Sequence, residues 1–240
     1  GTSFTNDASS TGIGTIDSSG SVSDTSGFSI VSWSGTGSNG TIKHGLSTVP
    51  KMIIVKSRSH AKDWTVYHSA LGNTKWIELN ATTAEQSSSN RWNNTSPTSS
   101  VFTVATDSSV NASGYTYIAY SFAEKQGYSK IGSYTGNNNA NGPFIYTGFK
   151  PAWVIIKNAS SGQNWVMFDS KRPGFNLIND YMHPNTNDAE TDEDSLDFLS
   201  NGFKIRSSGN DRNGSGNTLI YMCFAESPFV SSGGIPTTAR

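Results

Sequence analysis

The residues best suited to chemistry in this sequence are those that could hold a sugar. Arg91-Trp92-Asn93-Asn94 places an indole between a guanidinium and two amides in a polar loop. On glycan-binding surfaces an exposed aromatic ring covers the apolar face of a sugar, and amides bond its hydroxyls. Trp92, Arg91, Asn93 and nearby Trp76 are therefore the candidate glycan-binding residues. A buried Trp92 that anchors the loop is the alternative.

A second candidate site is the acidic stretch from Asp188 to Asp197. Oxygen-rich loops of this kind bind Ca²⁺, and Asp188, Asp192 and Asp194 are the candidate ligands. The spacing of an EF-hand loop, with its central glycine, is missing. A solvated acidic loop is the alternative, and no cofactor other than Ca²⁺ is expected.

Catalytic motifs are not evident, and we expect the protein not to be an enzyme. Its four histidines lack Cys, Asp or Glu partners at metal-ligand spacing and are expected at surfaces or edges. No serine has the surroundings of a hydrolase nucleophile. Glu124 and Glu226 form a carboxylate pair, as glycoside hydrolysis requires. Each follows the last strand of a repeat, where a charge protects a strand end, and this structural role is favoured.

Those glutamates mark the ends of an internal repeat. Gly27-Phe28-Ser29 opens a segment that closes at Phe122-Ala123-Glu124, and Gly127-Tyr128-Ser129 opens another that closes at Phe224-Ala225-Glu226. A repeat of about a hundred residues is a whole folding unit. Short apolar runs between turn-forming residues predict about seven strands in each repeat, as in a β-sandwich. Only residues 82–89 and 187–199 could hold a helical turn.

We therefore predict an all-β fold with two tandem, homologous antiparallel β-sandwich units of jelly-roll or lectin-like type. The first unit covers residues 27–126 and the second residues 127–229. Residues 1–26 are a Ser/Gly-rich arm or linker, and residues 230–240 a C-terminal tail. Because just three residues join Glu124 to Tyr128, the units are expected to be close neighbours. They form either two domains or one pseudo-two-fold body.

Composition narrows the function further. The formal net charge is −1 and charged residues make up 15% of the chain, so a basic nucleic-acid-binding face is not expected. Aromatic residues reach 11%, which favours a folded chain. No apolar run approaches the length of a membrane span. A single cysteine, Cys223, excludes an internal disulfide and is expected to be a small buried side chain.

Four long motifs lie at Gly27–Trp33, Pro50–Lys56, Tyr128–Gly136 and Asp197–Arg206. They resemble a family of repeats in virion structural proteins of tailed phages, notably phages of marine cyanobacteria. The resemblance covers nearly everything from Gly27 to Phe229. It implies a virion surface protein of tail-fibre or appendage type, assembled in the host cytoplasm and then extracellular, and it implies no catalytic residues.

Two functions fit these expectations. The first is adhesion, with a host-surface glycan or protein receptor as partner. The second is a capsid decoration or tail subunit whose partners are other virion proteins. A homo-oligomer is expected, a trimer if the protein belongs to a fibre, although coiled-coil heptads are absent. A glycan depolymerase is a third, weaker reading.

Overall fold

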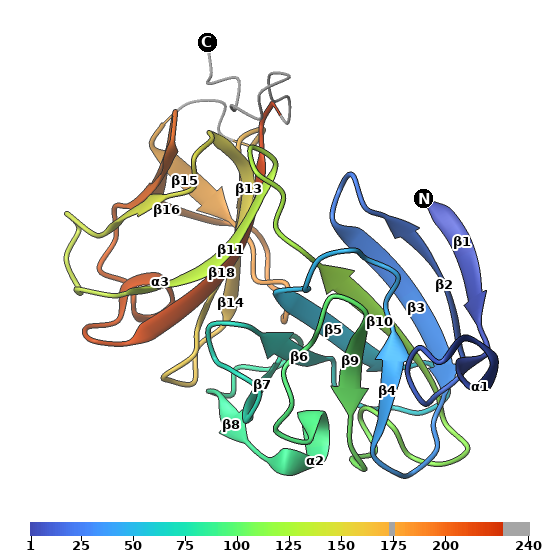
Figure 1. The fold of residues 1–240 in the computed structure, drawn as a ribbon. Helices are drawn as coiled ribbons and strands as arrows, with labels where there is room; N and C mark the ends of the chain where they lie inside the picture. Colours follow the sequence, from blue (N-terminus) through green and yellow to red (C-terminus); the bar gives the residue numbers. More distant parts are fainter. Residues whose placement is uncertain (173–175, 228–240) are drawn as a thin grey trace. The chain divides into compact units, whose positions relative to one another are not determined.

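The computed structural model describes residues 1–172 and 176–227, so the predicted tail at 230–240 lies outside the described residues (Figure 1). Regular structure is almost entirely antiparallel β-sheet, which confirms the all-β, sandwich-like prediction. The chain divides into two compact units. Unit 1 comprises Gly1–Leu79 and Glu85–Ala123, and unit 2 comprises Asn80–Ala84 and the chain from Glu124 onward. The segment Asn80–Ala84 thus belongs with the second unit, outside the boundary expected from the repeat.

Unit 1 contains one large and one small sheet. The large sheet has eight strands in the order β1-β2-β3-β10-β5-β6-β7-β8, and the small sheet pairs β4 with β9. Their bounds are β1 Thr2–Asn6, β2 Ser18–Ser23, β3 Phe28–Ser34, β4 Gly40–Lys43, β5 Met52–Ser57, β6 Thr65–His68, β7 Lys75–Glu78, β8 Gln86–Ser87, β9 Val101–Val104 and β10 Thr116–Phe122.

Apolar side chains of the two sheets meet in one core. Val31 and Trp33 of β3 are buried, whereas the residues on either side of them are less so, and both pack with Ile42 of β4 and Phe102 of β9. The Trp33 ring contacts Phe102 edge-on, with 5.8 Å between ring centroids. Burying each such side chain contributes about 2 kcal/mol, so this alternation fixes which face of β3 looks inward.

The N-terminal residues are part of the large sheet, and the prediction of an arm or linker at 1–26 is wrong. β1 pairs with β2, and β2 with β3, over continuous antiparallel registers. Helix α1, Ala8–Thr11, joins the two strands and is capped by Asp7, whose side chain accepts a hydrogen bond from Ser10 N. Ser- and Thr-rich strands carry little apolar alternation, which is why the sequence did not indicate them.

The described residues of unit 2 form two four-stranded sheets, in the orders β11-β18-β13-β14 and β12-β17-β16-β15. Their bounds are β11 Ser129–Thr135, β12 Phe144–Tyr146, β13 Pro151–Asn158, β14 Trp165–Asp169, β15 Ile178–Tyr181, β16 Thr191–Leu199, β17 Gly202–Ile205 and β18 Thr218–Ala225. The core between them includes Ile156 of β13, Tyr221 and Cys223 of β18, and Phe203 of β17. Cys223 is buried, as predicted, and burial raises the pKa of its thiol.

The same strand order recurs in the two units. The last strand of each, β10 or β18, lies between the first long strand, β3 or β11, and the Pro-led strand, β5 or β13. Gly35 and Gly136 both follow the first of these strands. A Cβ on either would lie 2.1 Å from a backbone oxygen, that of Ala112 or Gly214. The matching contacts agree with the sequence repeat, whose origin by duplication stays a prediction.

Helices are short. Besides α1, the structure has α2 at Ser89–Trp92 and α3 at Asn210–Asn213. The helical turn that the sequence allowed at residues 187–199 is not formed, because residues 191–199 form strand β16. None of the helices in the described part of the chain combines the length and apolar character that a membrane span requires.

Candidate functional site

The predicted glycan-binding loop is a packed anchor. Trp92 is 2% exposed, its Nε1 donates to Lys75 O at 3.0 Å, and its ring meets Tyr67 edge-on at 6.0 Å. Trp92 closes helix α2 and faces the core of unit 1. Its indole therefore has no free face for a sugar, and of the two readings the buried anchor is the correct one.

Arg91, Trp76 and Asn93 support that anchor. The Arg91 guanidinium lies 4.0 Å above the Trp76 ring and forms an ion pair with Asp107. Burial lowers the pKa of Arg91, and the charge of Asp107 opposes this shift. Asn93 adopts a left-handed conformation, with φ of 50°, and its Oδ1 accepts a hydrogen bond from Asn39. The structure brings the predicted residues together, but as support for the loop and not as an exposed platform.

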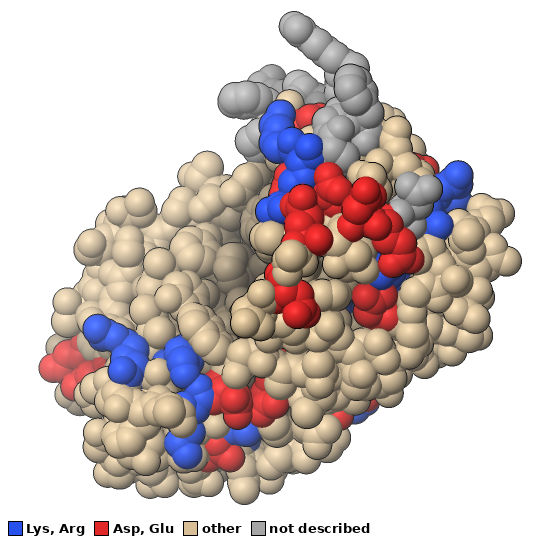
Figure 2. Space-filling model, turned by 180° about the vertical axis from the view of Figure 1, so that it is seen from behind, with Lys and Arg blue, Asp and Glu red and all other residues tan. Residues whose placement is uncertain are grey.

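The acidic stretch is partly exposed loop and partly strand β16. Figure 2 shows a face of the molecule with large uncharged areas and with acidic side chains in several groups, the largest of them in the upper part of the view. Asp188 and Asp192 are exposed, and Asp192 lies opposite Asp180 in the sheet and accepts a hydrogen bond from Asn179. The side chain of Asp194 lies outside the described part. Among described residues no three His, Cys, Asp or Glu side chains gather as metal ligands, so the calcium site stays a prediction.

The paired glutamates hold strand ends. Glu124 accepts a hydrogen bond from Ile131 N at 2.8 Å and lies 3.6 Å from Lys130 Nζ. Glu226 forms an ion pair with Lys150 at 2.8 Å. These contacts are those of the structural role favoured from the sequence.

Two histidines are not at the surface, contrary to expectation. His44 and His68 are buried, and burial lowers the pKa of His44. Leu46 N donates to His44 Nδ1, so the other ring nitrogen carries the proton and donates to Thr98 O. This is a neutral, structural histidine.

An exposed pair of aromatic rings on strand β12 was missed by the sequence analysis. Phe144 is 46% and Tyr146 is 65% exposed, on either side of the buried Ile145. Residues two apart on a strand point to the same side, about 7 Å from each other. Together with Val49, they are the exposed large apolar side chains of the described residues. The two rings thus form one small platform.

The neighbouring strand leaves room around these rings. Gly202 of β17 lies opposite Tyr146, and a Cβ on it would approach 3.0 Å from Phe144 Cε2 and 2.1 Å from Ile145 O. A larger residue would disturb both ring and backbone. Lys204 lies opposite Phe144 and donates from Nζ to Gly142 O at 2.9 Å.

An amide-rich loop leads into β12. Asn137, Asn138, Asn139 and Asn141 are exposed, and the backbone is ordered by the buried Asn213. Asn213 Oδ1 accepts from Asn137 N at 2.8 Å, and its Nδ2 donates to Asn139 O at 2.9 Å. The loop ends at Asn141, three residues before Phe144, and aromatic rings and exposed amides are the groups that bind a polyhydroxylated ligand.

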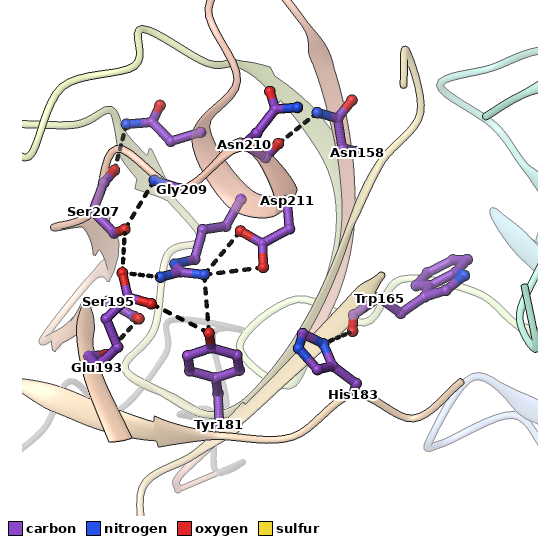
Figure 3. Close-up of polar contacts among 12 residues, drawn as sticks. Asn158, Trp165, Tyr181, His183, Glu193, Ser195, Ser207, Gly209, Asn210 and Asp211 are labelled. Atoms are coloured by element: carbon purple, nitrogen blue, oxygen red, sulfur yellow. Dashed lines mark hydrogen bonds and ion pairs between the residues drawn. The ribbon is translucent and has the colours of Figure 1, made fainter. Parts of the chain in front are cut away.

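A buried arginine network is a second feature that the sequence did not indicate. The Arg212 side chain is 2% exposed and forms ion pairs with Asp211 at 2.8 Å and Glu193 at 2.7 Å. Figure 3 shows Tyr181, Glu193 and Asp211 converging on this guanidinium, which lies 4.8 Å from the Tyr181 ring centroid. Burial alone would lower the pKa of Arg212, but the neighbouring acidic groups raise it. The network links β15, β16 and α3, which indicates a structural role.

Comparison with known proteins gives a family and no described activity. No curated protein and no solved structure matches the chain. A family described as a domain of unknown function, DUF7483, matches residues 4–228. The match includes β2 through β18 and therefore nearly every element of both units. The chain belongs to the DUF7483 family.

Proposed function

We propose that the protein is a non-enzymatic surface component of a phage virion, of tail-fibre or appendage type, that binds host-surface glycans through Phe144 and Tyr146. The observation that carries glycan binding is the exposed aromatic pair, which follows the exposed amide loop 137–141 in the chain. The virion setting is supported by the motif resemblance alone. The site proposed from the sequence around Trp92 is replaced by this one.

Binding at one such platform is weak. Covering about 50 Å² of apolar ring surface on each residue contributes about 2.5 kcal/mol in total. A dissociation constant of about 1 mM needs about 4.1 kcal/mol, so hydrogen bonds from the amides must add to the rings. Repetition of weak sites raises avidity by about 10² to 10⁴. The proposal therefore includes a homo-oligomer, a trimer in a fibre, that presents several platforms to one cell surface.

A glycan array tests the adhesive function. The intact chain is compared with a Phe144→Ser/Tyr146→Ser double variant, with and without Ca²⁺. Val49→Ser is the matched control, because Val49 is 48% exposed and lies in unit 1. We expect binding that the double variant loses and the control keeps. Equal binding by all three proteins, or none by any, would refute the site. Dependence on Ca²⁺ that Asp192→Asn abolishes would assign a metal to the acidic stretch.

A structural subunit with only protein partners is the second candidate, and the same strand favours it. Among the described strands, β12 lies at a sheet edge and pairs with β17 alone. Ile205 N donates to Pro143 O and Thr147 N to Asn201 O, so the intervening Phe144 and Tyr146 direct their backbone groups away from β17. Such an edge can pair with another subunit.

Light scattering and labelling of virions separate the two functions. A structural contact predicts that the double variant changes the oligomeric mass while no glycan is bound. Immunogold labelling of phage particles with an antibody against the chain tests the virion setting. Particles that contain the protein by mass spectrometry but bind no antibody would contradict surface exposure.

A further inference from the structure

A shallow, open groove, most of whose lining residues are polar in type, lies on the outer face of the large sheet of unit 1. Its volume is about 360 Å³, and it is lined by residues of β1, β2, β3 and β10 together with Arg58. Small-molecule sites range from about 300 to 1,000 Å³, so this groove is large enough for one or two sugar rings. It lies apart from the aromatic pair in sequence and in unit.

The strand register places hydroxyl groups in rows across the groove. Thr5, Ser19 and Ser32 lie opposite one another on β1, β2 and β3, and the Ser19 and Ser32 hydroxyls are 3.3 Å apart. Ser34 and Thr116 pair in the next row. Trp33 points into the core, so Ser32 and Ser34 face outward. Hydroxyls both donate and accept, as the hydroxyls of a saccharide require.

The row that contains Ser34 and Thr116 has a charged residue at each end. Continuing the register by one position brings Asp7 opposite Asp17, Asp17 opposite Ser34, and Thr116 opposite Arg58, whose N–H donates to Thr116 O at 2.7 Å. Three strand spacings, about 14 Å, separate Asp17 from Arg58, too far for an ion pair. Arg58 is exposed and has no ion pair with a described residue.

The acidic end is already engaged. Asp7 Oδ1 accepts from Ser9 Oγ and Ser10 N, and these hydrogen bonds lower the pKa of Asp7. Asp17 Oδ1 accepts from Ala8 N at 2.8 Å. Their second oxygens can still accept from ligand hydroxyls, whereas Arg58 offers a planar fork that matches a carboxylate. Ser18 and Trp33 also border the groove, but they lie opposite each other with their side chains on the core side of the sheet, so the outward-facing rows supply its hydrogen-bonding side chains.

We propose that this groove binds an acidic saccharide of one or two residues, with a uronic acid carboxylate at Arg58 and sugar hydroxyls along the Ser/Thr rows. The groove is a second site, and the proposal does not rest on glycan binding by Phe144 and Tyr146. It assigns different chemistry to the two units: stacking on rings in unit 2, and hydrogen bonds with one ion pair in unit 1.

Titration calorimetry of the full chain with digalacturonate and with the neutral digalactose tests the proposal. We expect digalacturonate to bind more tightly than digalactose. Arg58→Gln should lower the affinity for digalacturonate about tenfold or more, because losing a hydrogen bond to a charged group costs at least the free energy of a tenfold change in affinity. Ser34→Ala/Thr116→Val should weaken both ligands. Arg206→Gln, at another exposed arginine, should change neither.

Amide chemical shifts then locate the ligand. Changes should centre on residues 5–7, 17–19, 32–34, 58 and 116, and should persist in Phe144→Ser/Tyr146→Ser. Equal affinity for both disaccharides, no binding, an unchanged affinity in Arg58→Gln, or shifts confined to other residues would each overturn the proposal. A negative result for the groove does not affect the proposed site at Phe144 and Tyr146, and a negative result for that site does not affect the groove.

Discussion

At the scale of single residues, Lys157 is the group through which pH should act most clearly. Its side chain is fully buried in unit 2, and Nζ donates to Thr82 O at 3.0 Å and to Gln163 O. Burial lowers its pKa from 10.5 to about 8. The segment Asn80–Ala84 thus contributes a backbone carbonyl that helps to hold a buried ammonium group.

This shift predicts a rise in stability with pH. Below pH 8 Lys157 is charged in both states and the cost of burying the charge is present in full; above its unfolded pKa both forms are neutral and the cost is gone. Between these limits the unfolded chain holds more protons, so the free energy of unfolding increases, by about 3 kcal/mol in total. Lys157→Met should lack this increase.

Urea unfolding of both proteins from pH 7 to pH 10 measures it. The raised pKa values of Tyr134, Tyr221 and Cys223 act in the opposite direction at high pH. The difference between protein and variant removes their contribution, because both proteins contain them. Parallel stability profiles would show that the pKa of Lys157 is not lowered in the folded protein.

At the scale of elements, one asparagine in each unit holds the turn after the first long strand. Asn111 and Asn213 are fully buried. Asn111 accepts from Thr36 N at 3.1 Å and donates to Ser38 O at 2.7 Å, and Asn213 makes the corresponding bonds to Asn137 and Asn139. Removing such a buried amide leaves the backbone groups that it bonded without hydrogen bonds.

Asn111→Ala and Asn213→Ala should therefore each lower the free energy of unfolding by about 2 to 3 kcal/mol. Limited proteolysis should locate the effect, with new cleavage near residues 36–40 in the first variant and near 137–141 in the second. Asn73→Ala, whose side chain makes one exposed hydrogen bond, is the control. Cleavage in the same turn for both variants would contradict local clamping.

The elements also show how far the sequence could lead. Strands with apolar alternation or β-branched runs, such as Met52–Ser57, were predictable because burial demands that pattern. β2 and β16 were not, because serines and acidic residues occupy their outward faces. Trp92 was misplaced because composition cannot distinguish an exposed from a buried indole. The run Phe144-Ile145-Tyr146 is visible in the sequence, but the side of the strand that is buried becomes clear only from its pairing with β17 in the structure.

At the scale of the whole molecule, the net charge is low, so the two proposed sites should differ in how their ligand affinity responds to salt. The formal net charge is −1 over 240 residues, so long-range attraction contributes little to binding. Raising the salt concentration from about 0.1 M to about 1 M shortens the Debye length from about 10 Å to about 3 Å. Stacking on Phe144 and Tyr146 involves no ion pair and should keep its affinity, while digalacturonate binding at Arg58 should weaken several-fold. Calorimetry at both salt concentrations, with digalactose as the uncharged control in the groove, measures each response. An equal loss of affinity at the two sites in high salt would mean that charge contributes to binding at both. Unchanged affinity at both would contradict the proposed ion pair between Arg58 and the ligand.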